Sequence, residues 1–197
     1  MLRLVIATTN QHKIGEIREL LADLPIELVT LGEWPGSPVA EETGATFAEN
    51  ARAKALHYAA ITGELTVAED SGLEIAALGG RPGVESARFG GPAASYPEKF
   101  ALIYDALARS GSADRTARFV CALALARGDA VLFEARGTVE GTIAPEPKGT
   151  AGFGYDPIFF YPAWGITLAE AGERKSRVSH RAAAFRELAR YLERHAG

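Results

Sequence analysis

Cysteine is nearly absent from this chain of 197 residues, in which Cys121 stands alone. A single cysteine excludes an internal disulfide, and its place inside the apolar run 119–126 predicts an inert, buried thiol in a reducing compartment. No apolar run approaches the roughly 18 residues of a membrane-spanning helix. Residues 1–9 lack the length and cleavage site of a signal peptide. We therefore expect a cytoplasmic protein with no membrane partner.

An excess of positive charge is also lacking, because the net charge is −4 and the isoelectric point is near 5.6. Binding to the phosphate backbone of nucleic acids needs a broad basic surface, so we expect no nucleic-acid partner. Lysine is rare, which makes any lysine in a motif informative; it occurs at positions 13, 54, 99, 148 and 175.

Hydrophobic residues make up 47% of the chain. A chain of this length buries about 70% of its unfolded surface, which predicts one compact domain over residues 1–197. Strand-like apolar runs alternate with segments of helical spacing, as in an α/β fold. The expected strands are 2–6, 26–31, 65–68, 117–126, 130–142 and 158–161. The expected helices are 13–24, 46–62, one from Ser95 and one from Ser179.

Two adjacent acids, Glu69 and Asp70, directly follow the strand expected at 65–68 and precede Ser71-Gly72. The pattern predicts that both acids project from a strand end into a turn, where α/β proteins bind ligands. Carboxylates there can hold a hard cation or activate a water molecule. The alternative is that they only cap a turn.

The loop after the first strand offers Thr8, Thr9 and Asn10, with Lys13 in the first turn of the following helix. Free backbone N–H groups and a cation at a helix start suit an anion such as phosphate. A plain N-cap explains Thr9 and Asn10 equally well. It leaves Lys13 unexplained, since a cation there opposes the helix dipole.

A capping box at Thr46 and Glu49 predicts the start of the second helix. Asn50 and Lys54, four residues apart, share one face of that helix. Lys54 has the alternative of a solvated position. The acids just upstream, Glu41 and Glu42, are either surface charges or metal ligands.

The glycine-rich loop 145–157 is long for a compact domain, which indicates function. Its aromatic residues suit a flat ligand such as a nucleobase, although a simple hairpin is the alternative. Further on, Ser179 is a natural N-cap that places His180 and Arg181 in a first helical turn. Two donors there favour an anion or a carbonyl oxygen; the alternative is an exposed basic turn.

Taken together, six motifs in register resemble the Ham1/RdgB family of inosine triphosphate pyrophosphatases over essentially the whole chain. The motifs are Thr-x-Asn-x-x-Lys at 8–13, Glu-Glu-Thr-Gly-x-Thr-Phe-x-Glu-Asn-Ala-x-x-Lys-Ala at 41–55, acid-Asp-Ser-Gly-Leu at 69–73, Pro-Gly-Val-x-Ser-Ala-Arg at 82–88, Gly-Phe-Gly-Tyr-Asp-Pro-x-Phe at 152–159 and Ser-His-Arg at 179–181.

The resemblance implies a three-layer α/β fold, in which flanking helices cover a mixed β-sheet and two lobes surround a central cleft, usually in a homodimer. It also implies Mg²⁺-assisted hydrolysis of the purine nucleoside triphosphates ITP, dITP, XTP and dXTP to monophosphate and pyrophosphate. The chain departs from the family pattern at Thr9 and His12, where glycine is common, at Glu69, where aspartate is usual, and at Ser176, where asparagine is frequent.

By the same resemblance, Asp70 is the proton acceptor for water attacking the α-phosphorus. Asp70 and Glu41 are the best candidates for the Mg²⁺ ligands, with Glu42 or Glu69 in reserve. The implied phosphate and sugar contacts are Thr8, Thr9, Asn10, Gln11, His12, Lys13, Lys54 and Ser71. The implied base contacts are Phe153, Gly154, Tyr155, Asp156, Lys175, His180 and Arg181. The alternatives are a Maf-type pyrophosphatase for pyrimidine or modified nucleotides and a nucleotide-binding module without turnover.

Overall fold

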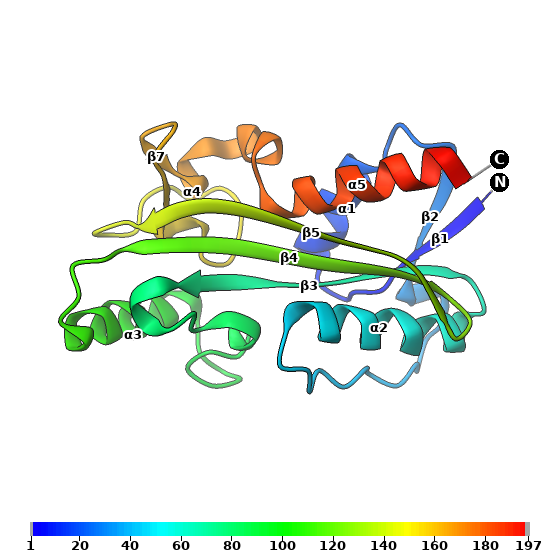
Figure 1. Ribbon diagram of the computed structural model, residues 1–197, viewed down its shortest axis with the longest axis horizontal. Coiled ribbons are helices and arrows are strands. Elements are labelled where there is room, and N and C mark those ends of the chain that lie inside the picture. The colour runs from blue at the N-terminus through cyan, green and yellow to red at the C-terminus, as the bar shows by residue number, and fades with distance from the viewer. Residues whose placement is uncertain (1, 196–197) are drawn as a thin grey trace. The chain divides into compact units, whose positions relative to one another are not determined.

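The computed structural model describes residues 2–195, whose strands form one seven-stranded sheet in the order β2-β1-β3-β4-β5-β6-β7 (Figure 1). The sheet is mixed: β1 pairs in parallel with β2 and β3, whereas β6 runs antiparallel to β5 and β7. The prediction of an α/β fold with a mixed sheet is confirmed.

The strands are β1 Leu2–Ile6, β2 Ile26–Thr30, β3 Leu65–Ile75, β4 Thr116–Arg127, β5 Ala130–Ile143, β6 Phe159–Tyr161 and β7 Ile166–Thr167. The helices are α1 Gln11–Leu20, α2 Phe47–Thr62, α3 Tyr96–Ser110, α4 Leu168–Ala171 and α5 His180–His195. Most boundaries lie within a few residues of the predicted ones. The last predicted strand is shorter, because a 3-10 turn, η4 (Asp156–Ile158), precedes β6.

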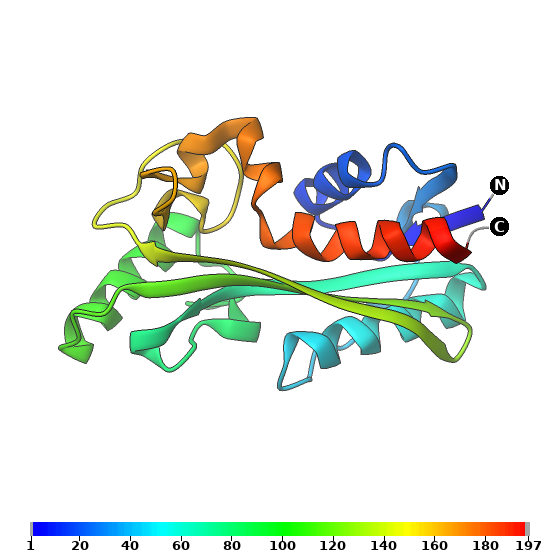
Figure 2. The same cartoon turned by 45° about the horizontal axis from the view of Figure 1, so that its top comes forward.

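The described chain divides into two compact units, which share β3, β4 and β5. The first unit comprises residues 2–70, 121–137 and 180–195. Its core joins strand residues such as Leu4 and Leu123 to Ile17 of α1 and Phe185 of α5. Helices α1 and α5 lie on one face of its strands and α2 lies on the other (Figure 2).

The second unit comprises residues 71–120 and 138–179. Its core joins Leu73, Phe119 and Phe159 to Ile103 of α3 and Leu168 of α4. Helix α3 lies on one face of these strands and α4 on the other (Figure 2). That residues 1–197 form a single domain stays a prediction.

The prediction that a strand ends before Glu69 is wrong, because β3 continues to Ile75. Gly72 marks close packing instead of a turn: a Cβ there would lie 2.3 Å from Ser86 Oγ. Ser86 Oγ also accepts a hydrogen bond from Leu73 N at 2.9 Å. Since side chains alternate along a strand, Glu69 and Asp70 project to opposite faces of the sheet.

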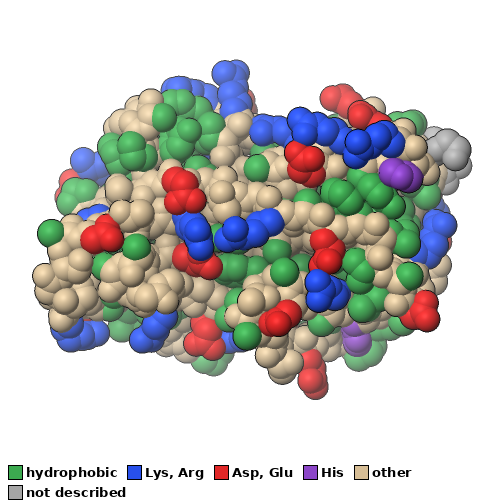
Figure 3. All heavy atoms as spheres, in the orientation of Figure 1, with side chains coloured by type: hydrophobic (Ala, Val, Ile, Leu, Met, Phe, Trp, Pro, Cys, Tyr) green, Lys and Arg blue, Asp and Glu red, His purple; other side chains and the backbone are tan. Residues whose placement is uncertain are grey.

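No helix among residues 2–195 is long and apolar enough to cross a membrane. On the face shown in Figure 3, basic and acidic side chains are interspersed. That distribution agrees with the small net charge of −4.

Candidate active site

Asp70 is a buried carboxylate in the interior of β3, where it meets helix α2. Its Oδ2 accepts a hydrogen bond from Asn50 Nδ2 at 2.9 Å, and Asn50 is itself 1% exposed. The predicted capping box fixes the start of α2 four residues earlier, because Thr46 Oγ1 accepts from Glu49 N while Thr46 N donates to Glu49 Oε2. Local helix chemistry thus holds the amide that orients Asp70.

The surroundings of Asp70 raise its pKa above the ordinary aspartate value. Burial is the main cause, and the charge of Glu42 adds to it. The charge of Lys54 and the hydrogen bond from Asn50 act in the opposite direction without cancelling the effect. A carboxylate with a raised pKa is a stronger proton acceptor when ionised, which is what a general base needs.

Lys54 lies one helical turn after Asn50 and is half-buried, so the alternative of a solvated lysine is wrong. Its Nζ donates to the backbone oxygen of Glu69 at 3.2 Å and forms an ion pair with Glu42. The amino group therefore lies beside the strand that carries Asp70, where it can neutralise a bound anion.

The acids available for a metal ion are few, since no group of three or more His, Cys, Asp or Glu residues within 2–195 could hold one. Glu41 is exposed, whereas Glu42 is half-buried and is the acid whose charge acts on Asp70. Mg²⁺ in nucleotide enzymes is commonly held by one or two carboxylates together with phosphate oxygens. Asp70 and Glu42 fit that donor set.

Glu69 points to the other face of β3 and is 2% exposed. Its carboxylate lies 2.7 Å from Arg181 Nε and 3.5 Å from Lys13 Nζ, and it accepts the thiol hydrogen of Cys121 at 3.3 Å. Burial raises the pKa of Glu69, but the charges of Arg181 and Lys13 outweigh that effect and hold it well below the usual glutamate range. Glu69 and Asp70 cannot ligate one ion together, because they face opposite sides of the sheet.

The ion pair with Glu69 also explains Lys13, whose cation at a helix start opposes the dipole of α1. Asn10 is the N-cap of α1, as the alternative interpretation predicted. Its side chain accepts hydrogen bonds from His12 N at 3.0 Å and Lys13 N at 3.3 Å. Helix α1 therefore begins at Gln11, two residues before the predicted start. Thr9, Asn10, Gln11 and His12 are exposed, and Thr8 is half-buried.

His180 and Arg181 open α5 and are 5% and 1% exposed, so the alternative of an exposed basic turn is wrong. Arg181 Nη1 also reaches Glu16 Oε2 of α1 at 2.5 Å. The opposing charges of Glu69 and Glu16 keep the pKa of Arg181 above its ordinary value despite burial, which acts to lower it. Arg181 thus links α1, β3 and α5.

In the second unit, Asp156 organises the predicted base-binding segment from a buried position. Its Oδ2 accepts from Lys175 Nζ at 2.7 Å and from Phe153 N at 2.9 Å. Lys175 Nζ lies 4.8 Å from the centre of the Phe153 ring. Gly152 is required for this arrangement, since a Cβ there would lie 2.2 Å from Asp156 Oδ2.

Tyr155 belongs to the core of the second unit, at 3% exposure. Its hydroxyl donates to Ser86 O at 2.8 Å, and its ring meets that of Tyr96 edge-on, with centroids 5.4 Å apart. Gly154 adopts a φ of +70° between Phe153 and Tyr155, and Ser71 is half-buried directly after Asp70. Ser86 was not among the predicted site residues; the motif at 82–88 is the signal that pointed to it.

Known proteins of one family resemble this chain over nearly its whole length. The model of the Ham1 family matches residues 4–191. A dITP/XTP pyrophosphatase of an Exiguobacterium species is 47% identical over 188 residues, which cover 95% of each chain. A dITP/XTP pyrophosphatase of Desulforamulus reducens is 44% identical over 194 residues, covering 98% of this chain and 96% of that protein.

The fold has close counterparts among solved structures. A HAM1 protein from Coxiella burnetii superposes with a TM-score of 0.92 at 43% identity, covering 98% of this chain and 100% of that one. The Ham1 protein of Staphylococcus aureus superposes with a TM-score of 0.88 at 36% identity, covering 98% and 99%.

Proposed function

The chain belongs to the Ham1 family, and on that basis we propose that it is a dITP/XTP pyrophosphatase. It hydrolyses dITP, ITP, XTP and dXTP to the nucleoside monophosphate and pyrophosphate, which removes these non-standard purine nucleotides from the nucleotide pool. The observation that carries the proposal is the buried carboxylate of Asp70, which Asn50 orients and whose pKa is raised.

Asp70 is the general base in this proposal. It accepts a proton from a water molecule that attacks the α-phosphorus, so that pyrophosphate leaves. General-base catalysis of this kind typically contributes ~10²- to 10⁴-fold to the rate. Lys54 supplies positive charge on the same side of β3, and Lys13 with residues 8–12 supplies donors to the phosphates. Positioning and charge neutralisation dominate catalysis of phosphoryl transfer.

Mg²⁺ is the proposed cofactor, with Asp70 as one carboxylate ligand. Glu42 is the better candidate for the second acid because its charge acts on Asp70, and Glu41 remains the candidate from the family resemblance. When bound, the ion neutralises phosphate charge and polarises the phosphate oxygens. Glu42 forms an ion pair with Lys54.

In this proposal the enzyme recognises the base through its 6-carbonyl group. Phe153 stacks on the purine, and Lys175, His180 and Arg181 provide donors that suit the carbonyl of inosine or xanthosine. Adenine presents an amino group there, which would leave buried donors unpaired and so disfavour ATP. The ion pair between Lys175 and Asp156 holds the lysine close to Phe153, which supports its place beside the base.

Two further features are proposed from family membership alone. The enzyme is a cytoplasmic homodimer, and Gly154, Tyr155 and Ser71 contact the nucleotide through backbone or side-chain groups. For Tyr155 the contact would come from the backbone, since its hydroxyl donates to Ser86 O.

A panel of nucleoside triphosphates tests the function. The purified protein is incubated with Mg²⁺ and dITP, XTP, ATP, GTP, dTTP or UTP, and monophosphate and pyrophosphate are quantified. We expect kcat/KM for dITP and XTP to exceed the others by at least ~10²-fold. Faster turnover of dTTP or UTP would favour the pyrimidine-directed alternative. Nucleotide binding that is equally tight without Mg²⁺, with no product, would favour a module without turnover.

A further inference from the structure

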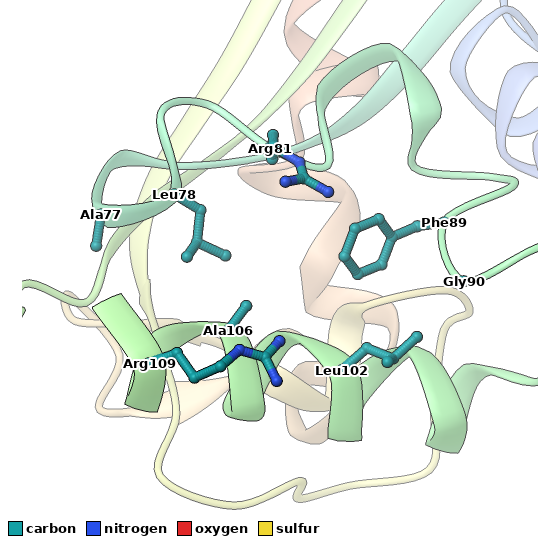
Figure 4. Close-up of a pocket in the computed structure, with 8 residues that line it drawn as sticks. All are labelled: Ala77, Leu78, Arg81, Phe89, Gly90, Leu102, Ala106 and Arg109. Atoms are coloured by element: carbon teal, nitrogen blue, oxygen red, sulfur yellow. The ribbon is translucent and has the colours of Figure 1, made fainter. Parts of the chain in front are cut away.

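A cavity of about 600 Å³, open to solvent along the exposed side chains of Arg81, Leu102 and Arg109, lies wholly within the second unit, between α3 and the segment 77–90. Its walls are Ala77, Leu78, Arg81, Phe89, Gly90, Leu102, Ala106 and Arg109 (Figure 4). Cavities of ~300–1,000 Å³ with apolar walls and a few polar groups are typical ligand sites. None of the residues assigned to the proposed catalytic reaction lines it.

Helical spacing explains the α3 wall. The Ser95–Glu98 capping box starts the helix, and Phe100, Ile103 and Leu107 face the core. Positions 102, 106 and 109, which are four and three residues apart, therefore share a neighbouring face that turns toward the cavity (Figure 4). The opposite wall comes from η2 (Ala76–Leu78) and the chain that follows it, where Gly79 and Gly80 have φ values of +65° and +85°.

Two guanidinium groups give the cavity its charge. The side chains of Arg81 and Arg109 enter from opposite walls, and neither has an ion pair or side-chain hydrogen bond to any residue within 2–195 (Figure 4). Two other arginines of this unit are paired, Arg88 with Glu85 and Arg118 with Glu74. Arg109 lies in the last turn of α3, where the helix dipole stabilises a positive charge. The dipole does not account for the unpaired charge of Arg81.

The chemistry of the walls selects the ligand. No acid lines the cavity, so a cation is disfavoured. Two guanidinium forks match the oxygens of a phosphate group, and a phosphate monoester near pH 7 carries about the two negative charges that would balance them. Phe89, Leu78 and Leu102 offer a ring face and aliphatic surface for a flat apolar group.

We propose that this cavity binds a nucleoside monophosphate, with the phosphate between Arg81 and Arg109 and the base against Phe89. The residues that line the cavity are the reason to expect a phosphate and a flat ring, whereas the choice of a purine such as inosine rests on the proposed function. Since a nucleoside monophosphate is a product of that reaction, the cavity is a second site at which product binds outside the catalytic residues.

Nuclear magnetic resonance on the full chain tests this without turnover. IMP, inosine and inorganic phosphate are titrated separately while the backbone amide shifts of Gly90 and Ala106 are followed. We expect IMP to shift both amides to saturation. Arg81→Gln and Arg109→Gln should each weaken this binding by at least about 10-fold, because each removes a charged hydrogen bond. Arg127→Gln, an exposed arginine of β4 outside the cavity, is the matched control and should leave it unchanged.

Several outcomes would overturn the proposal. If inosine binds as tightly as IMP, the arginines do not recognise the phosphate; if inorganic phosphate binds as tightly, Phe89 does not recognise the base. If IMP moves neither amide, the cavity is not a binding site. Leu102→Asp should weaken IMP binding without changing the sedimentation coefficient. If this variant instead converts a dimer to monomers, and IMP does not move the amides of the native protein, the face is an interface between copies. If the native protein does not hydrolyse dITP, the proposed function is contradicted but the proposed binding site is not, because the titration requires no catalysis.

Discussion

Replacement of Glu69 by glutamine removes the charge that holds two cations in the first unit. In the native protein the Glu69 carboxylate lies 2.7 Å from Arg181 Nε, and both side chains are 1% exposed. Removal of one partner from a buried ion pair costs ~3–5 kcal/mol, because the other charge stays buried without compensation. Arg181 keeps Glu16, whose side chain is 27% exposed, so we expect the lower end, ~3 kcal/mol.

The assay is thermal unfolding at pH 7, followed by circular dichroism. For a chain of about this size, 1 kcal/mol shifts Tm by ~2–4 °C, so Glu69→Gln should lower Tm by roughly 6–12 °C. Glu134→Gln is the matched control. It breaks the exposed pair of Glu134 with Arg52 at 3.0 Å, which is worth at most ~1 kcal/mol.

The pH dependence gives a second readout with a defined sign. The pKa of Glu69 is lower in the folded than in the unfolded protein, so its stabilisation is present above the unfolded value of ~4.3 and is lost as the pH falls toward the folded value. The difference in stability between the native protein and Glu69→Gln should therefore shrink below about pH 4.3. A Glu69→Gln protein as stable at pH 7 as the Glu134→Gln control would refute this account of the buried cluster.

Three further predictions concern catalysis. Asp70→Asn should fold as the native protein does but lose at least ~10²-fold in kcat with dITP, and full activity would remove Asp70 from the role of base. Lys54→Met should move the acidic limb of the kcat/KM pH profile to higher pH, since Lys54 lowers the pKa of Asp70; an unmoved limb would separate the two groups. His180→Ala should reduce the ratio of kcat/KM for ITP over ATP, and an unchanged ratio would exclude His180 from base selection.

Features that depend on neighbours in sequence could be predicted from the sequence. The capping box joins Thr46 to Glu49 within one helical turn, and the cap of α1 joins Asn10 to the next three residues, so residue type and spacing are sufficient. The alternation of strands and helices was likewise visible in the spacing of apolar residues. These local rules gave the α/β fold with most boundaries off by a few residues, whereas the mixed sheet was implied by the family resemblance.

Features that depend on distant residues could not be predicted in this way. Ser-Gly after Asp70 has the composition of a turn, and only the packing of Ser86 against Gly72 shows why the strand continues. The ion pair of Lys13 with Glu69 could not be predicted, because Glu69 lies 56 positions ahead in the chain. Arg181 meets Glu69 across 112 positions, and no local pattern contains that pair.

The burial of Arg181 also changes how its role is tested. Arg181 is one of the implied base contacts, so Arg181→Ala is expected to change base preference. In the structure it would leave Glu69 buried beside fewer cations, so a loss of stability should accompany any change in preference. His180→Ala leaves the ion pair between Arg181 and Glu69 in place, which is why it is the better variant for testing specificity.

Hydrolysis of ITP in water enriched in ¹⁸O tests the central claim most directly. The proposed attack of water on the α-phosphorus, with Asp70 as base, places the label in IMP and none in pyrophosphate. Attack on the β-phosphorus gives the same two products but places the label in pyrophosphate. Label in IMP that depends on Asp70 would support the mechanism, and label in pyrophosphate, or release of IDP and phosphate, would contradict it.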